Sequence, residues 1–319
     1  MNEEVEVSRR RVSRRRALAL GGTLSVGALL AAACGDDRTG GGSAAPTTAA
    51  PGDAVENLLA TAPTCVMTSA AIVGPYWFDV DDIRDDIRED RPGTQLNLAL
   101  RVHDVSECSA GGAAKPVPNA VVELWHCDAG GVYSGFEQGS LAAGSGPGDA
   151  PPPGGPPVGG PGGEPPEGGP GGGPPPGMPP GAGNDVEGTG SGGSSDGSYS
   201  SGDAESATTD DGTYLRGAQP TDAAGIAYFT TIFPGWYIGR TTHIHVKVHI
   251  DKKTVLTTQL YFDDDTKKAV YATAPYTDHA GWQENTQNSD DFIFDESGMF
   301  AIARQGDGYL AAINLGIDI

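Results

Sequence analysis

Two histidines at alternating positions of one segment, His243 and His245, could bind a metal ion together. Residues 242–250 alternate polar and apolar side chains, which is the pattern of a β-strand. Alternate residues of a strand lie on one face, about 6.6 Å apart, so both imidazoles could reach a single ion. Lys247 and His249 would lie on the same face. The alternative is a polar sheet face exposed to solvent, and spacing alone does not exclude it.

The loop that leads into this segment adds two groups suited to chemistry. Residues 234–240 form a short stretch with two glycines, and they include Tyr237 and Arg240. A tyrosine can supply an anionic phenolate oxygen, and an arginine stays charged at any physiological pH. Imidazole nitrogens and a phenolate oxygen close together in the sequence therefore favour a metal centre over a solvated sheet face.

The elements that would position these side chains are also predicted to be strands. The same alternation occurs in residues 94–102, 120–128, 225–232 and 257–262. Turn-forming Gly, Pro and Asp residues lie between them, and little of the chain has a helical pattern. We therefore predict an all-β fold, an antiparallel sandwich or barrel. A net charge of −22 argues against nucleic-acid binding, which depends on Lys and Arg.

Several segments resemble the intradiol ring-cleavage dioxygenases. The matching segments are residues 74–76, 84–88, 121–128, 131–134, 214–217, 221–225, 229–237, 239–245 and 258–262. They occur in the order typical of that family, and the resemblance runs from about residue 63 to residue 317 with one interruption. It implies an antiparallel β-sandwich of the intradiol dioxygenase type.

The resemblance also implies a metal centre with four protein ligands. Carried over to this chain, the ligands of one non-haem Fe(III) ion per domain are Tyr133, Tyr237, His243 and His245. Two phenolates and two neutral imidazoles suit the hard ferric ion. The implied substrates are a catechol-type aromatic diol and O₂, and the implied product is a cis,cis-muconate-type diacid formed by cleavage between the two hydroxyl-bearing carbons.

Other matched positions have implied roles in the same reaction. Tyr237 would accept a substrate proton, and Arg240 would stabilise negative charge that develops on the ring. Gln259 matches a polar residue next to that arginine, and Tyr76 lies in a segment that lines the substrate entrance in the family. The loop between Tyr237 and His243 is shorter than in the well-studied cytoplasmic members, so their substrate preferences do not transfer to this chain.

Two other readings of these residues stay open. The first is a non-catalytic exported β-sandwich that binds a ligand and retains the metal motif. The second is a different metal, zinc or copper; zinc prefers His, Cys and carboxylate ligands to two phenolates.

Residues 1–34 have the features of an export signal. Arginines at positions 14–16 precede a moderately apolar stretch, residues 17–33, and this arrangement resembles a twin-arginine signal. The stretch ends at Cys34 in a sequence that resembles a lipoprotein cleavage site. We expect Cys34 to carry lipid and to hold the exported protein on the outer face of a bacterial cytoplasmic membrane. This lipid anchor is the only membrane contact that we expect. The alternative is an uncleaved anchor, although its glycines make it a poor membrane span.

The rest of the chain divides by composition. We predict a flexible linker over residues 35–62 and a dioxygenase-like domain over residues 63–319. Gly and Pro fill 37 of the 60 positions from 141 to 200, which predicts a disordered insert over residues 140–208.

A disulfide is expected outside the cytoplasm. We predict that Cys108 pairs with Cys127, because a turn at residues 116–119 would fold the flanking strands together, and that Cys65 stays unpaired within the domain. A homodimer is left open by the sequence.

Overall fold

The computed structural model describes residues 51–108, 113–140 and 192–319. These residues belong to one compact unit, Thr48–Ile319. The predicted export signal, Cys34, the first part of the linker and most of the insert lie outside the described residues. No helix in the described part of the chain is long and apolar enough to cross a membrane.

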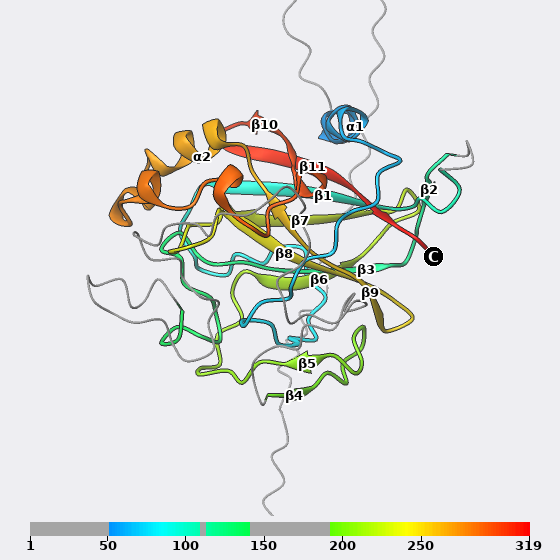
Figure 1. The fold of residues 1–319 in the computed structure, drawn as a ribbon, viewed down its shortest axis with the longest axis horizontal. Helices are drawn as coiled ribbons and strands as arrows, with labels where there is room; N and C mark the ends of the chain where they lie inside the picture. The colour runs from blue at the N-terminus through cyan, green and yellow to red at the C-terminus, as the bar shows by residue number, and fades with distance from the viewer. Residues whose placement is uncertain (1–50, 109–112, 141–191) are drawn as a thin grey trace, which may run out of the picture. The chain divides into compact units, whose positions relative to one another are not determined.

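Two β-sheets form the body of this unit (Figure 1). The five-stranded sheet contains β10 (Ala301–Gln305), β11 (Gly308–Ile317), β1 (Gln95–Asp104), β2 (Lys115–Pro116) and β7 (Ile226–Ile232). The four-stranded sheet has the order β6 (Arg216–Pro220), β3 (Val121–Trp125), β8 (His243–Ile250) and β9 (Lys253–Tyr261). Neighbouring strands are antiparallel except for β1 and β11, which pair in parallel.

The hydrophobic core lies between the two sheets. Alternate residues of each strand contribute to it, as the period-two pattern predicts. From the four-stranded sheet come Val122, Leu124, Ile244, Val246 and Val248, and from the five-stranded sheet come Leu98, Leu100, Phe229, Ala311 and Ile313. The predicted all-β sandwich is therefore confirmed.

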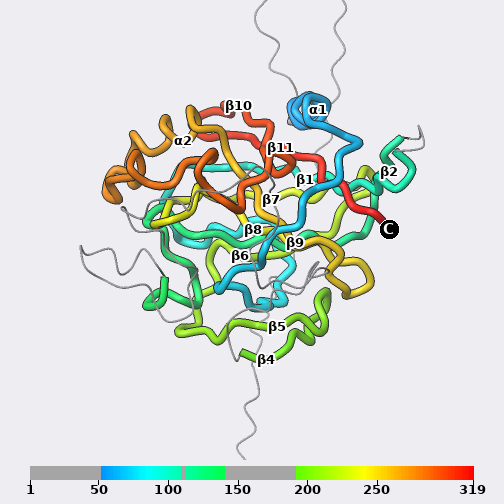
Figure 2. The backbone as a smooth tube through the Cα atoms, viewed as in Figure 1, coloured from blue at the N-terminus to red at the C-terminus, as the bar shows by residue number. Residues whose placement is uncertain are grey.

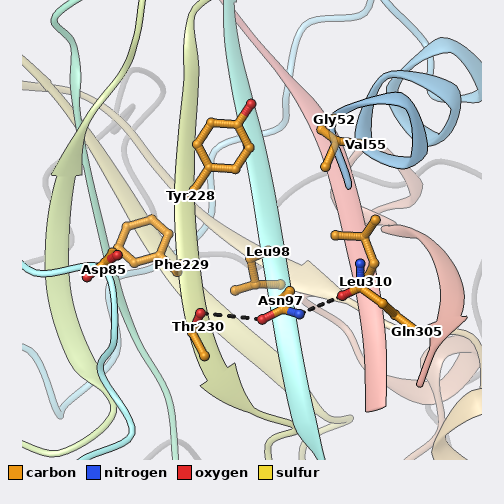
Figure 3. Close-up of a pocket in the computed structure, with 10 residues that line it drawn as sticks. All are labelled: Gly52, Val55, Asp85, Asn97, Leu98, Tyr228, Phe229, Thr230, Gln305 and Leu310. Carbon is orange, nitrogen blue, oxygen red and sulfur yellow. Dashed lines mark hydrogen bonds between the residues drawn. The ribbon is translucent and has the colours of Figure 1, made fainter. Parts of the chain in front are cut away.

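The linker prediction is wrong for its last part, because Pro51–Thr61 form helix α1. Val55 and Leu59 lie one helical turn apart and pack on Ile226 and Leu310 of the five-stranded sheet. This burial offsets the entropy of ordering the segment. Beside α1, a cavity of about 390 Å³ opens on the same sheet, where Asn97 bonds to Gln305 (Figure 3).

A second helix and several short turns lie between β9 and β10. Helix α2 (Asp264–Tyr271) begins after Asp263, whose carboxylate accepts a hydrogen bond from the Thr266 amide. Single 3₁₀ turns follow at Tyr276–Asp278, Trp282–Glu284, Asn288–Asp290 and Glu296–Gly298. These turns bring residues 285–291 to the loop that carries Tyr237 and Arg240.

The end of the predicted disordered insert is ordered. Residues 192–208 include the short strands β4 (Gly193–Ser194) and β5 (Ala204–Glu205), and they cover part of the four-stranded sheet. Asp203 accepts hydrogen bonds from Lys247 and Thr254, and the ring of Tyr199 lies against His249. The low-complexity composition did not reveal that this part pairs with buried polar groups of the sheet.

The predicted disulfide is wrong, because Cys108 pairs with Cys65 rather than with Cys127. The end of β11 brings them together: the Thr68 amide bonds to the carbonyl of Gly316, and the Val105 amide bonds to that of Ile317. Cys127 follows β3 into a buried aromatic cluster, and its thiol is free.

A strap, defined as residues 65–78, crosses the four-stranded sheet from the disulfide (Figure 2). The Ala71 amide bonds to the carbonyl of Thr257 on β9, and the Trp77 carbonyl accepts from the Ser206 amide. The strap and residues 192–208 together cover the polar face of the sheet, so this face is buried.

Candidate metal centre

The two histidines lie on that covered polar face. In β8, His243, His245, Lys247 and His249 all lie opposite the core side of the strand, and each is buried. The solvated sheet face that the sequence left open as an alternative is therefore absent here. Burying imidazoles costs free energy unless their nitrogens find partners.

Three donor atoms meet at one point in front of β8. The Nε2 atoms of His243 and His245 lie 3.1 Å apart, and Tyr237 Oη lies 3.1 Å from His243 Nε2. His243 Nδ1 donates to the Thr241 carbonyl at 2.6 Å, which leaves its Nε2 as the lone-pair nitrogen. This tautomer is the one a metal ligand needs.

Tyr133 closes another side of the same space. The turn after β3 positions it: the Asp128 carboxylate accepts hydrogen bonds from the amides of Gly130 and Val132, and the Tyr133 amide donates to Ser140 Oγ. The Tyr133 ring centroid lies 5.9 Å from that of Tyr237 and 6.0 Å from that of His245. Its hydroxyl is buried and has no partner in hydrogen-bonding geometry within the described chain.

Burial determines the protonation of these groups when no cation is bound. It lowers the pKa of His243 and of His245, so both rings are neutral at physiological pH. Burial likewise raises the pKa of Tyr133 and of Tyr237 above the usual value near 10. Neutral imidazoles are ready ligands, whereas each phenol must lose its proton to bind a metal.

The donor set fits a metal ion with mixed nitrogen and oxygen ligands. Donor atoms that each bond to one metal ion at about 2.1 Å lie roughly 3 to 3.5 Å from one another, and the two contacts of His243 Nε2 are in this range. The orphaned Tyr133 hydroxyl is an obvious further donor. Within the described residues, no group of three or more His, Cys, Asp or Glu side chains could hold a metal, so this centre depends on its tyrosines.

Arg240 lies beside the centre and is held by two side chains. Its Nε donates to Asp291 Oδ2 at 2.9 Å, and its Nη2 donates to Gln259 Oε1. Gln259 in turn donates to the carbonyl of Ile72 in the strap. Burial by itself lowers the pKa of Arg240, but Tyr237 and Asp291 outweigh it, and the pKa is raised.

Asp291 was not identified from the sequence. Its Oδ2 also accepts a hydrogen bond from the Thr241 amide at 2.8 Å, so one carboxylate holds both the arginine and the start of β8. It is 51 residues away from Arg240 in the chain, and no local pattern connects the two. Packing of the turns after α2 brings them together.

Aromatic groups and the strap enclose the remaining sides. Tyr76 stacks on Tyr133 with ring centroids 4.6 Å apart, and Trp125 stacks on His245 at 4.9 Å. Gly74 of the strap lies directly against the His245 ring. Sequence reasoning placed Tyr76 near the substrate entrance and missed the contacts of Gly74.

Other histidines of the chain lie apart from this centre. The His126 ring is hydrogen-bonded between the Cys127 carbonyl and Thr231 Oγ1, both at 2.8 Å. His249 bonds through Nε2 to Glu123 and through Nδ1 to Thr254. These rings are satisfied by protein groups and leave no nitrogen for the centre.

Buried tyrosine and histidine side chains that could bind one metal ion lie at one sheet of a β-sandwich. Known structures with these features are therefore the ones to compare with this chain. The chain is similar to the intradiol ring-cleavage dioxygenase of Tetranychus urticae, with 24% identity and a TM-score of 0.55 over 80% of this chain and 95% of that one. A second dioxygenase structure matches with 25% identity and a TM-score of 0.53 over the same shares. The dioxygenase domain of a carbohydrate-binding fusion protein from Streptomyces sp. SirexAA-E matches with 20% identity and a TM-score of 0.45, over 80% of this chain and 99% of that one.

The chain therefore has the fold of the intradiol ring-cleavage dioxygenases, as the sequence resemblance predicts. No protein-family model matches the chain, and no curated protein matches it.

Proposed function

We propose that the protein is a non-haem Fe(III) dioxygenase that opens the ring of a catechol-type substrate between its two hydroxyl-bearing carbons. Both atoms of O₂ enter the product, so catechol itself, C₆H₆O₂, would give the diacid C₆H₆O₄. The observation that carries this proposal is the convergence of Tyr237 Oη with the Nε2 atoms of His243 and His245 beside the unpartnered Tyr133 hydroxyl.

Tyr133, Tyr237, His243 and His245 would hold the iron. When bound, the ferric ion would act as a Lewis acid and a template, making the chelated diol reactive toward O₂. Tyr237 would accept a proton from a substrate hydroxyl; the 3.1 Å contact between its oxygen and His243 Nε2 supports this role.

Arg240 would stabilise the negative charge that develops on the substrate ring. Asp291 and Gln259 hold its guanidinium in place, so little reorganisation is needed as charge moves. The stacked rings of Tyr76 and Trp125 exclude water around the ligands, which strengthens these charge interactions.

The test is a visible spectrum together with oxygen uptake. The purified protein is loaded with iron, and uptake of O₂ is followed with catechol and with ring-substituted catechols. We expect a red colour from tyrosinate-to-Fe(III) charge transfer and the consumption of one O₂ per diol. A colourless protein that binds zinc in preference to iron, or one that binds iron without consuming O₂, would reject it.

We also propose that the protein acts outside the cytoplasm and is held there by lipid on Cys34. The signal-like residues 1–34 support this location, and so does the Cys65–Cys108 disulfide, because such bonds persist in oxidising compartments. Replacing Cys34→Ala should move the protein from the membrane fraction to the soluble fraction. An unchanged membrane fraction would reject the lipid anchor.

A further inference from the structure

A buried arginine with no ion pair lies next to the candidate metal centre. Arg216 opens strand β6 and is 2% exposed. It forms no ion pair with any described carboxylate, and its Nη1 has no hydrogen-bond partner within the described chain. Burial lowers the pKa of Arg216, and the carboxylate of Glu123, which lies beyond ion-pair distance, offsets this only in part. Burying this cation is therefore costly, and its place in the core calls for a reason other than stability.

The two remaining nitrogens of this arginine bond to a single residue. Arg216 Nε donates to Ser134 Oγ at 2.9 Å, and Nη2 donates to the Ser134 carbonyl at 2.8 Å. Ser134 is fully buried and directly follows Tyr133. Its hydroxyl donates to the Tyr214 carbonyl at 2.6 Å, so the contact joins the loop of Tyr133 to the start of β6.

Aromatic rings keep the guanidinium in one orientation. Its carbon lies 4.4 Å from the ring centroid of Phe78 and 5.7 Å from that of Phe136. A planar guanidinium held between rings can present two donors at a defined angle, which a lysine cannot do. Ser134 is therefore held at two points, its side-chain oxygen and its backbone carbonyl.

The register of the sheet connects Arg216 to the other side of the centre. Arg216 pairs with Trp125 on β3, and Trp125 pairs with His245 on β8. Trp125 also stacks on the His245 ring. One row of residues across three strands thus contacts the segment of Tyr133 at one end and contains His245 at the other.

We propose that Arg216 is the positioning residue for Tyr133, holding this ligand in place through its two-point contact with Ser134. The inference rests on the proposed iron site, because positioning matters only if Tyr133 binds the metal. Groups that orient metal ligands typically change metal affinity by 10-fold to 100-fold when removed.

The test compares iron affinity with the stability of the metal-free protein. In Arg216→Met, we expect iron affinity to fall by about 10-fold to 100-fold and the tyrosinate-to-Fe(III) band to weaken or shift. The unfolding free energy of the metal-free protein should change by less than the free energy of iron binding does, because removal of the buried charge offsets part of the loss of the two hydrogen bonds to Ser134. Arg216→Lys keeps the charge but loses the planar pair of donors that contacts Ser134. Its iron affinity should therefore lie between that of the wild type and that of Arg216→Met.

Arg304→Met is the control for the change of residue type, because Arg304 also lies over an aromatic ring, that of Tyr309, but is exposed and belongs to a hairpin on the other sheet. This variant should keep both iron affinity and colour. Unchanged iron affinity in Arg216→Met would overturn the inference, and so would a loss of metal-free stability as large as the loss of affinity.

Ser134→Ala decides the outcome if Arg216→Met does not fold. It removes one of the two acceptors and should lower iron affinity by roughly 3-fold to 10-fold, the effect of one hydrogen bond. No change in Ser134→Ala would then overturn the inference. A wild-type protein that binds no iron rejects the proposed function itself, and the positioning role falls with it.

Discussion

Gly74 of the strap touches the ring of His245: a Cβ atom at Gly74 would lie 3.1 Å from His245 Cε1. The backbone at Gly74 has a φ of +78°, a conformation that residues with side chains rarely adopt. The strap therefore approaches the candidate metal centre at a position where only glycine fits without displacing His245.

Gly74→Ala should lower iron affinity by about 10-fold, because the added methyl group pushes on His245. Gly202→Ala is the control, since Gly202 has a φ of +91° and no atom within 4 Å of a Cβ. Both variants should lose about 1–2 kcal/mol of unfolding free energy from backbone strain, but only Gly74→Ala should lose iron. Equal iron affinities in the two variants, measured by titration, would contradict this contact.

Tyr133→Phe should remove most of the iron and the colour while leaving the fold intact. Loss of the hydroxyl leaves no buried group without a partner, because the neighbouring Tyr237 Oη keeps its hydrogen bond to His243 Nε2. Iron content and the visible spectrum check this, with unfolding in urea as the measure of stability. Tyr199→Phe is the control, because Tyr199 is also buried but lies beside His249, away from the centre. Normal oxygen uptake by Tyr133→Phe would reject this tyrosine as a ligand.

Arg240→Lys should slow turnover without loss of iron. A lysine lacks the planar guanidinium that donates to Asp291 and Gln259 from two separate nitrogens, so the positive charge would be held less firmly toward the substrate. We expect kcat to fall by roughly 10²-fold to 10³-fold. Steady-state oxygen uptake measures the change, and an unchanged charge-transfer band shows that the ligands are intact. A loss of colour equal to the loss of rate would instead mean that Arg240 supports the metal centre.

Cys65→Ser should lower the unfolding free energy of the domain by about 4 kcal/mol. The reason is that the unfolded chain regains the entropy that the disulfide removes by closing a loop between cysteines 43 residues apart. Cys127→Ser should have a much smaller effect, since that thiol is free. Urea unfolding with and without reductant checks both variants. Reductant should destabilise the wild type and Cys127→Ser and leave Cys65→Ser unchanged. A bond to Cys127 would instead make reductant destabilise Cys65→Ser and leave Cys127→Ser unchanged.

His126 should make the stability depend on pH below neutrality. Burial lowers its pKa to about 4, whereas an unfolded histidine has a pKa near 6.5. As the pH falls from 6.5 to 4, the unfolded chain binds a proton that the folded chain excludes, so the folded state loses stability in this pH range. Above pH 6.5 the stability contributed by neutral His126 is fully present.

The His126 contribution amounts to about 2 kcal/mol between pH 7 and pH 5. His126→Asn cannot titrate and should reduce the change in unfolding free energy by that amount. Urea unfolding of both proteins at the two pH values checks this. Identical pH dependence in the wild type and the variant would contradict the neutral, buried state of His126.

Local patterns in the sequence were sufficient for the elements that carry the site. The period-two alternation of β8 places His243 and His245 on one face, and the same rule places Val246 and Val248 in the core. The fold followed from such strands and from the family resemblance. The roles of Arg240 and Gln259 stay predictions, although the two side chains are in contact.

Contacts between distant segments could not be predicted, because no local pattern encodes them. Asp291 reaches Arg240 only after the turns beyond α2 have packed. The apolar pattern of the α1 residues is short, and the segment forms a helix because the sheet offers an apolar surface to Val55 and Leu59.

The sequence by itself determined which side chains face the centre, since the alternation of a strand is a property of its own backbone. The tertiary structure alone decided how those side chains are held: by the strap at Gly74, by Asp291 behind Arg240, and by Arg216 behind Ser134. It also decided that Cys65, and not Cys127, meets Cys108. The physical reason is that each of these contacts depends on the packing of segments far apart in the chain.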